Sequence, residues 1–361
     1  MIEKLIENLN AKKSKTGSKA SPVVISSRIR LARNLKDYVF PNRANFTQRC
    51  DILSKVETAL EGDSKFKKGF FYKIGDLSQL EKRLLVERHL ISRELCEKES
   101  GSGVFISSDH SCSVMINEED HMRIQFLKNG FNLNALWKIV NQFDDLMDSR
   151  LPYAYSKDYG YLTACPTNLG TGLRASVMMH LPGLTISENI DKVIRASNQL
   201  GLAVRGLFGE GSEASGHIYQ ISNQQTLGES EGDILARLGG VLKNILEHEL
   251  NARYKYIEDH KAQLFDKIGR SYGVLRNAHI MNSDEAMNHL SFMRMAVDIG
   301  LFEEEFRGLI DYLFMEIQPG HIQYPESDVS VEFRDIKRAE ILRNNFQKLP
   351  LVNFDNFSEQ F

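Results

Sequence analysis

Hydrophobic and polar positions follow a helical period in some stretches of the chain and alternate in others. Helical spacing of apolar residues predicts helices at residues 1–15, 47–60, 78–89 and 133–147. Period-two patterns predict short strands at residues 23–26, 104–106, 113–116 and 121–126, the middle two joined as a hairpin. Ser78 followed by Glu81 forms a capping box at a predicted helix start. The first half of the chain therefore mixes helices with short strands.

The second half changes from this mixed pattern to long helical periodicity. Thr185 and Glu188 predict a second capping box, which opens a helix to about Leu200. Strands at 202–208 and 217–222 flank a glycine-rich loop, and no convincing strand follows Glu229. Short hairpin-like strands favour an antiparallel sheet. We expect an α+β fold, with a mixed domain of strands and helices over residues 1–255 and a helical C-terminal domain over 256–361.

Composition narrows the class of protein. The 361 residues are 42% hydrophobic and 26% charged, with a net charge of −3, which is typical of a globular protein and gives no basic field for nucleic acid. Four widely spaced cysteines argue against zinc and against a disulfide framework. No apolar run is long enough to span a membrane, and charges interrupt the N-terminal segment where a signal peptide would need an apolar core. A cytoplasmic protein is the expectation.

The segment around Arg174 is a candidate phosphate site. A polar loop with two glycines, Thr167–Gly172, runs into an apolar segment whose spacing predicts a helix beginning near Arg174. Backbone N–H groups at a helix start suit an anion, and a guanidinium binds phosphate oxygens in bidentate fashion. A tight turn before an ordinary helix is the alternative, because a lone G-x-G is a weak motif.

Further arginines occupy similar settings. Alternation places Arg28 and Arg30 on one strand face, with Arg33 a few residues on. Arg123 lies on the strand after an acidic turn, and Arg205 ends a strand before the glycine-rich loop. Each alone is compatible with a solvated strand edge, since charged residues are mostly exposed.

Two acidic segments add carboxylates to these arginines. The turn at 117–121 carries Glu119 and His121, and the glycine-rich loop carries Glu210. A carboxylate beside a basic strand can act as a general base, while a plain acidic turn and a surface hairpin are the alternatives. Cys165 is either a packed small side chain or a reactive thiol. Arg334 and Arg338, four residues apart with Asp335 beside them, also fit a salt-bridged helix surface.

This inventory of residues fits phosphoryl transfer, which needs charge neutralisation and alignment more than covalent help. Arginines can hold the phosphates of ATP, and Mg²⁺ carried by those phosphates needs few protein ligands, so no metal motif is expected. Carboxylates suit a guanidinium acceptor, whose pKa of about 12 or higher makes it a poor nucleophile until a base removes a proton.

Several ordered motifs resemble those of the phosphagen (guanidino) kinase family. They are SSRIRLARN at 26–34, NEEDHMRIQ at 117–125, CPTNLGTGLRAS at 165–176 and RGLFGEGSEA at 205–214. LEKRLLVERHLIS at 80–92 and RDIKRA at 334–339 make the resemblance strongest to the bacterial protein-arginine kinase branch. The resemblance implies a glutamine-synthetase-like antiparallel sheet flanked by helices, followed by a helical C-terminal domain.

The resemblance also implies a role for each matching position. The nucleotide-contacting set is Ser26, Ser27, Arg28, Ile29, Arg30, His89, Arg123, Arg174, Ala175, Ser176, Val177, Met178, Arg205, Gly206, Leu207, Phe208, Gly209 and Glu210. The catalytic positions implied are Glu119 and Glu210, which hold and deprotonate the guanidinium, and Cys165 near the reacting group. The branch's allosteric phosphoarginine pocket matches Arg334, Asp335, Ile336, Lys337, Arg338 and Ala339.

The substrate class follows from a departure from the family. Kinases of free creatine or arginine carry a helical domain of about a hundred residues before the first nucleotide motif, whereas here that motif begins at Ser26. We expect an ATP-dependent protein-arginine kinase; the alternatives are a kinase of a small guanidino metabolite and a phosphoarginine-binding regulatory adaptor. The resemblance implies a homodimer, an activator protein, a stress-response repressor and a Clp-type unfoldase as partners.

Overall fold

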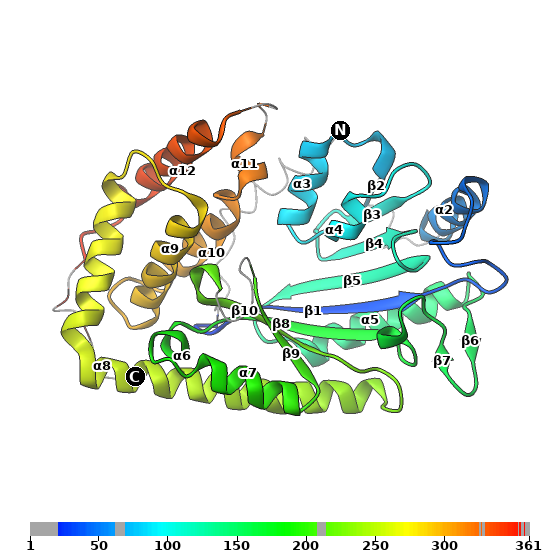
Figure 1. Ribbon diagram of the computed structural model, residues 1–361, viewed down its shortest axis with the longest axis horizontal. Helices are drawn as coiled ribbons and strands as arrows, with labels where there is room; N and C mark the ends of the chain where they lie inside the picture. The colour runs from blue at the N-terminus through cyan, green and yellow to red at the C-terminus, as the bar shows by residue number, and fades with distance from the viewer. Residues whose placement is uncertain are drawn as a thin grey trace. The chain divides into compact units, whose positions relative to one another are not determined.

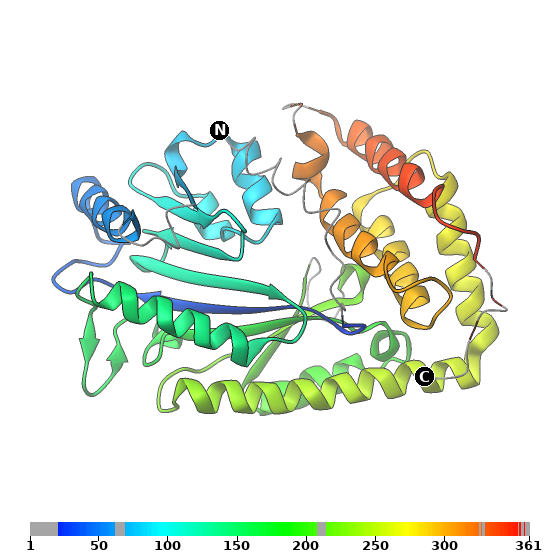
Figure 2. The ribbon, with the colours of Figure 1, turned by 180° about the vertical axis from the view of Figure 1, so that it is seen from behind.

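The computed structural model describes residues 21–61, 69–207, 214–324, 326, 329–352, 354 and 357. The ribbon is drawn from two sides in Figures 1 and 2. The strands are β1 (Val24–Arg33), β2 (Gly69–Lys73), β3 (Gly103–Ser107), β4 (Cys112–Ile116), β5 (Met122–Asn129), β6 (Tyr155–Ser156), β7 (Gly160–Tyr161), β8 (Leu173–His180), β9 (Leu202–Gly206) and β10 (Ile218–Asn223). The helices are α2 (Phe46–Glu61), α3 (Gln79–Glu87), α4 (Arg93–Cys96), α5 (Leu133–Asp148), α6 (Pro182–Ile186), α7 (Ile190–Gln199), α8 (Glu231–Asn277), α9 (Ser283–Asp298), α10 (Phe306–Glu316), α11 (Pro319–Gln323) and α12 (Val331–Phe346), with short 3-10 turns η1 (Ile74–Asp76), η2 (Pro166–Asn168) and η3 (Ser215–His217).

Eight strands form one sheet in the order β2-β3-β4-β5-β1-β8-β10-β9. β1 pairs with β5, β5 with β4, β4 with β3, and β3 with β2, all antiparallel. The predicted antiparallel sheet is thus confirmed, as are the hairpin of β3 with β4 and the capping box of Ser78 with Glu81 at α3.

The two faces of the central strands differ in chemistry. Ile29 and Leu31 of β1 are buried on one face, where α5 packs across the sheet, as Figure 2 shows. Phe126 of β5 meets Phe143 of α5 with ring centroids 5.5 Å apart. Because strand side chains alternate, Arg28 lies on the opposite face of the sheet.

The chain forms two compact units that are discontinuous in sequence. Within the described residues, one unit holds Ser26–Val177 and Ser222–Gly240; the other holds residues 21–25, Met178–Ile221 and the chain from Val241 onwards. The expected division at residue 255 stays a prediction.

The second unit has a helical core. Helix α9 packs against α10, α11 against α12, and α7 against β9. Leu290 of α9, Leu313 of α10 and Leu342 of α12 are fully buried within one apolar cluster. The long helix α8 bends at His260, whose φ of −139° is not helical. The prediction of a helical C-terminal region is confirmed.

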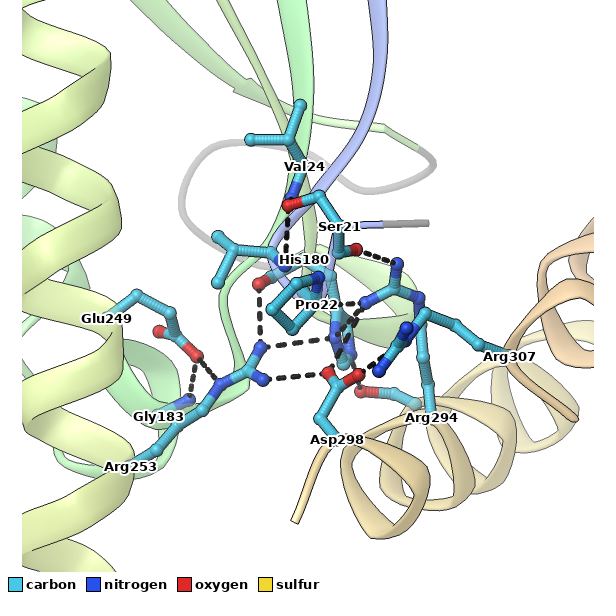
Figure 3. Close-up of polar contacts among 12 residues, drawn as sticks. Ser21, Pro22, Val24, His180, Gly183, Glu249, Arg253, Arg294, Asp298 and Arg307 are labelled. Carbon is cyan, nitrogen blue, oxygen red and sulfur yellow. Dashed lines mark hydrogen bonds and ion pairs between the residues drawn. The ribbon is translucent and has the colours of Figure 1, made fainter. Parts of the chain in front are cut away.

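A cluster of buried charges stabilises this second unit (Figure 3). Asp298 at the end of α9 accepts from Arg253 Nη1 at 2.8 Å and from Arg307 Nε at 2.7 Å, and it lies 3.5 Å from Arg294. Glu249 accepts from Arg253 Nε and from the backbone N–H of Gly183. Since a buried charge is costly without a partner, the cluster stabilises the fold only while it stays complete.

Arg294 connects this cluster to the chain that leads into β1. Its guanidinium donates to the carbonyl oxygens of Pro22 at 2.6 Å and Ser21 at 3.1 Å, and the backbone N–H of His180 donates to Val23. Figure 3 shows these contacts converging on Arg294 and His180. The start of β1 and the end of β8 are therefore held together within this unit.

Two local predictions were wrong. The segment at Arg174 is a strand, β8, because Leu173, Ala175, Val177 and Met179 are all buried at period two. Thr185 does not begin a helix: it lies inside α6, which begins at Pro182, and a separate helix, α7, begins at Ile190. The predicted helix at residues 1–15 lies outside the described residues.

Candidate active site

Arginines from three adjacent strands share one face of the sheet. Arg28 and Arg30 alternate along β1, and the register places Ala32 opposite Arg123 of β5. Arg28 Nε donates to Ser176 Oγ of β8 at 3.3 Å, so Ser176, and with it Arg174 two residues before, faces the same side. The structure thus brings together four arginines that the sequence analysis singled out.

The electrostatics of this face are those of an anion site. Burial, with Arg174 and Arg123 nearby, lowers the pKa of Arg28 to about 10. Burial and the neighbouring arginines also lower the pKa of Arg30 well below its ordinary value, and its Nε has no hydrogen-bond partner among the described residues. Gathered guanidinium groups repel one another, so a polyanion such as a nucleotide triphosphate would stabilise all four.

His89 lies beside this arginine face. Its backbone is left-handed, with φ +58°, and its carbonyl oxygen accepts from Gln125 Nε2 of β5 at 2.6 Å. Burial, and then the charge of Arg28, lower the pKa of His89 to about 4. His89 is therefore neutral at pH 7 and can offer hydrogen bonds without adding to the positive charge.

The acidic turn between β4 and β5 presents two carboxylates to one arginine. Arg123 Nη1 lies 2.6 Å from Glu118 and Nη2 lies 3.3 Å from Glu119. Glu118 is fully buried and also accepts from Ser92 at the start of α4. The Glu119 side chain is 35% exposed, so of the two it is the one that can reach a ligand.

His121 plays a structural part in this turn. Its Nδ1 accepts from the backbone N–H of Leu35 at 2.9 Å, which leaves Nε2 to donate to Val39 O, also at 2.9 Å. The ring is fully buried, and this burial lowers its pKa. With both nitrogens engaged, His121 is not available as an acid or a base.

Cys165 lies in the loop that precedes β8. Its Sγ is 3.0 Å from Thr167 Oγ1, and its backbone carbonyl accepts from Thr163 Oγ1 and from the N–H of Asn168. The thiol is partly exposed. The loop prediction for this segment is confirmed, and Cys165 has the accessibility that a reacting thiol needs.

The remaining nucleotide positions divide between core and surface. Ile29, Ala175 and Val177 are buried on the apolar face, so they support the arginine face through the backbone. Ser27 Oγ donates to Gly130 O at 2.7 Å and has a structural contact there. Arg205 is exposed on β9 in the second unit. Phe208, Gly209 and Glu210 lie outside the described residues.

The segment Arg334–Ala339 lies on α12. Arg338 is 2% exposed, pairs with Asp335, and donates to the carbonyl oxygens of Ile317 at 3.0 Å and Met281 at 2.8 Å. Burial lowers the pKa of Arg338, and Asp335 opposes that shift. Asp335 therefore already holds a guanidinium, that of its own neighbour.

Sequence reasoning assigns no structural role to three buried residues around this site. Arg33 lies on the face opposite Arg28 and pairs with Asp144 of α5 at 2.6 Å. Asn34 and Asp120 hydrogen-bond each other at 2.6 Å beneath the acidic turn. The strand period alone could have separated Arg33 from Arg28, but nothing local marks Asn34 or Asp120.

The part of the chain that the structure describes contains neither a metal-binding cluster nor a helix suited to a membrane. Within those residues no group of three or more His, Cys, Asp or Glu side chains is placed to hold a metal ion. None of the helices there is long and apolar enough to cross a bilayer.

Comparisons with known proteins match most of the chain. Residues 51–252 match the family model "ATP:guanido phosphotransferase, C-terminal catalytic domain". A lombricine kinase structure superposes with a TM-score of 0.57 at 26% identity, over 68% of this chain and 71% of that one. The duplicated taurocyamine kinase of Schistosoma mansoni gives a TM-score of 0.55 at 27% identity over 66% of this chain, which spans 33% of that enzyme. Fold, arginine face and family match define a phosphotransferase of the ATP:guanido class.

A family match in the C-terminal region and relatives of higher sequence identity narrow that class. Residues 261–357 match the model "Protein-arginine kinase McsB C-terminal domain". The protein-arginine kinase of Halothermothrix orenii is 42% identical over 89% of this chain and 92% of its own length. That of Bacillus subtilis is 44% identical over 90% of each chain. The chain belongs to the protein-arginine kinase family, a branch of the ATP:guanido phosphotransferases.

Proposed function

We propose that this protein transfers the γ-phosphoryl group of ATP to the guanidinium of arginine side chains in proteins. The observation that carries the proposal is the arginine face, where burial and like charges depress the pKa of Arg28 and of Arg30. A triphosphate bound there offsets that repulsion and is aligned for in-line transfer. The proposed phosphate-holding residues are Arg28, Arg30, Arg123, Arg174 and Arg205. The proposed nucleotide-contacting segments are Ser26 to Arg30, His89, Ala175 to Met178 and Gly206 to Glu210; within them, Ile29, Ala175 and Val177 lie on the apolar face and would support the site through the backbone.

Mg²⁺ fits this site as a partner of the nucleotide more than of the protein. The residues gathered on the face are arginines, which repel a cation, whereas the phosphates supply the hard oxygen ligands that Mg²⁺ prefers. Mg²⁺ would neutralise charge on the transferring group when bound. The protein's own contribution is then to hold the phosphates with its arginines.

Glu119 is the proposed acceptor-side carboxylate, with Glu210 as its partner and Cys165 nearby. Glu119 is partly exposed and already lies at hydrogen-bonding distance from one guanidinium, that of Arg123. A carboxylate in that position can hold a substrate guanidinium in plane and take its proton as attack on phosphorus begins. The leaving group is ADP, and the new bond is N–P on the arginine.

The proposal extends to the acceptor, the C-terminal domain and the partners of this protein. The family match over 261–357 favours a protein acceptor and a regulatory C-terminal domain, divided from the catalytic domain near residue 255. Arg334 to Ala339 are the proposed phosphoarginine pocket. We propose a homodimer in the cytoplasm, with an activator protein, a stress-response repressor and a Clp-type unfoldase as partners, so that phosphorylated proteins are marked for degradation.

A direct test uses the full chain with ATP, Mg²⁺ and an unfolded arginine-containing protein, or free arginine at matched guanidinium concentration. Mass spectrometry under conditions that preserve acid-labile N–P bonds reads the product. We expect kcat/KM for protein arginine to exceed that for free arginine by at least tenfold. Equal values would instead favour the small-guanidino kinase that the lombricine and taurocyamine kinase neighbours represent.

A further inference from the structure

The loop from Leu162 to Gly172 carries Cys165 and leads into β8, and buried side chains hold it at both ends. Asp120, in the turn that carries Glu119, bonds the beginning of the loop. Arg33, on the apolar face of β1, bonds its end. Both side chains are about 1% exposed, and neither figures in the chemistry assigned above.

At the first end, one carboxylate oxygen joins three segments of chain. Asp120 Oδ1 accepts from the backbone N–H of Ala164 at 2.7 Å and from Asn34 Nδ2 at 2.6 Å. Asn34 also donates to Leu162 O at 3.0 Å and accepts from the N–H of His121 at 2.8 Å. Because Ala164 precedes Cys165 and Asp120 follows Glu119, this network fixes the thiol relative to the carboxylate.

At the second end, Arg33 fills a site shaped around its guanidinium. Its Nη1 donates to Thr171 O and to Ala32 O, both at 2.9 Å, while Asp144 holds the other side of the group. The guanidinium carbon lies 3.5 Å from the ring centroid of Tyr161.

Gly172 shows how closely the backbone approaches Arg33. Its φ is +64°, and a Cβ there would lie 2.6 Å from Arg33 Nη1 and 2.6 Å from Ala32 O. A larger residue would force the turn away from the guanidinium. Since Arg174 follows two residues later, the position of this turn sets where Arg174 enters the arginine face.

We propose that Asp120 and Arg33 are positioning residues with separate duties: Asp120 aligns the acceptor side of the site, and Arg33 aligns the nucleotide side. The inference deepens the proposed function and depends on its assignment of Glu119, Cys165 and Arg174. Each duty follows from which end of the loop the side chain holds, and the six residues between Ala164 and Thr171 let one end move without the other.

The test compares four variants of the full chain. Asp120→Ala removes the acceptor of the Ala164 N–H, whereas Asp120→Asn keeps an oxygen at Oδ1 and serves as its conservative control. Arg33→Lys keeps the charge facing Asp144 but cannot also reach both carbonyl oxygens. Asp298→Asn, in the buried charge cluster of the second unit, is the control variant: it is expected to lower stability by weakening two buried ion pairs, and Asp298 does not touch the loop.

Four quantities are measured for each variant: KM for protein arginine, Kd for ATP, the rate of Cys165 alkylation by iodoacetamide, and Tm. Activities and alkylation rates are corrected for the fraction of folded protein. Asp120→Ala should raise the acceptor KM about tenfold and change Cys165 alkylation at least fivefold, with ATP affinity within twofold. Arg33→Lys should give the reverse pattern, with ATP affinity reduced about tenfold. Asp120→Asn should restore the acceptor KM to within about threefold of the wild type.

The division of duties is overturned if either variant shifts both substrates equally, or if both match Asp298→Asn once activity is corrected for the folded fraction. Failure of the proposed function looks different. In that case the wild-type chain makes no phosphoarginine, while Cys165 alkylation and ATP titration still report on the two ends of the loop.

Discussion

The guanidinium of Arg123 lies between Glu118 and Glu119, 2.6 Å from the first and 3.3 Å from the second. Glu118 is fully buried, and its short ion pair fixes the position of the Arg123 guanidinium. Glu119 has the longer contact and the more exposed side chain. It can therefore turn to a ligand while Arg123 keeps its ion pair with Glu118. Two adjacent carboxylates therefore divide into a structural partner and a candidate base.

Glu119→Gln is expected to lower kcat by about 10²- to 10⁴-fold, because an amide cannot accept the guanidinium proton. ATP affinity should remain within about twofold, since Arg123 keeps its stronger pair with Glu118. Steady-state kinetics with a protein acceptor and a separate ATP titration check both values. Near wild-type turnover would remove Glu119 from the chemistry.

Glu118→Gln provides the contrast. It removes the negative charge from a buried ion pair, so the loss should appear in the free energy of unfolding. If Glu118→Gln retained full stability and lost only turnover, the roles of the two carboxylates would be reversed.

Arg174→Lys should weaken ATP binding by about tenfold although the charge is kept. Arg174 Nη2 lies 3.4 Å from Ser222 Oγ of β10, and the planar fork of a guanidinium can hold phosphate oxygens in bidentate fashion. A lysine ammonium cannot make both contacts. Unchanged ATP affinity and rate in this variant would place Arg174 outside the nucleotide site.

Alternation in β1 and β5 was enough to predict the arginine face, but β8 was misread. The stretch LRASVMMH contains small residues and methionines that suit a helix, and its period of two is masked because Ser176 and His180 are buried as well. The segment forms a strand because it pairs with β1 on one side and β10 on the other, a tertiary contact that overrides local preference. The chemistry assigned to Arg174 survives because alternation still turns it to the arginine side.

The long-range contacts of the positioning residues could not have been found from sequence. Asp120 bonds Asn34 across 86 positions and Ala164 across 44, and no local pattern encodes contacts of that range. The motif N-E-E-D marks Asp120 only as one acidic residue among three. Arg33 follows Arg28 and Arg30 in one basic run of sequence, whereas its partner Asp144 lies 111 positions away.

Two histidines in the second unit predict an acid-sensitive fold. His180 Nε2 and His217 Nδ1 both lie 2.7 Å from the hydroxyl of Ser291. Burial, followed by Lys267, lowers the pKa of His217 from 6.5 to about 4, and burial with Arg294 and Arg253 lowers that of His180 well below its ordinary value.

Because these folded-state pKa values are depressed, the unfolded chain binds more protons below pH 6.5, and stability falls as the pH falls. For His217 the loss should begin near pH 6.5, continue to about pH 4, and have a slope of about 1.4 kcal/mol per pH unit. Denaturant titrations at several pH values measure it. His217→Asn should flatten that slope, and an unchanged slope would show that other groups cause the acid loss.

Substitutions of Asp335 and Arg338 test whether α12 carries a phosphoarginine pocket or whether this pair only stabilises the fold. In this structure Asp335 grips the guanidinium of Arg338, which also bonds the carbonyl oxygens of Ile317 and Met281. A phosphoarginine ligand would compete for the same carboxylate, so binding should exchange one guanidinium for another while Arg338 or Arg334 turns to the phosphate. Asp335→Ala should then abolish activation by phosphoarginine and leave basal transfer intact.

Arg338→Ala is the structural comparison, because its removal leaves two backbone acceptors and a carboxylate without a donor, at a cost of about 3–5 kcal/mol. Isothermal titration with free phosphoarginine and thermal unfolding read the two effects. Lost binding by Asp335→Ala with a Tm within about 2 °C of the wild type would support the pocket. A fall in Tm equal to that of Arg338→Ala, with phosphoarginine binding retained per folded molecule, would make the pair a tie between α12 and its neighbours and nothing more.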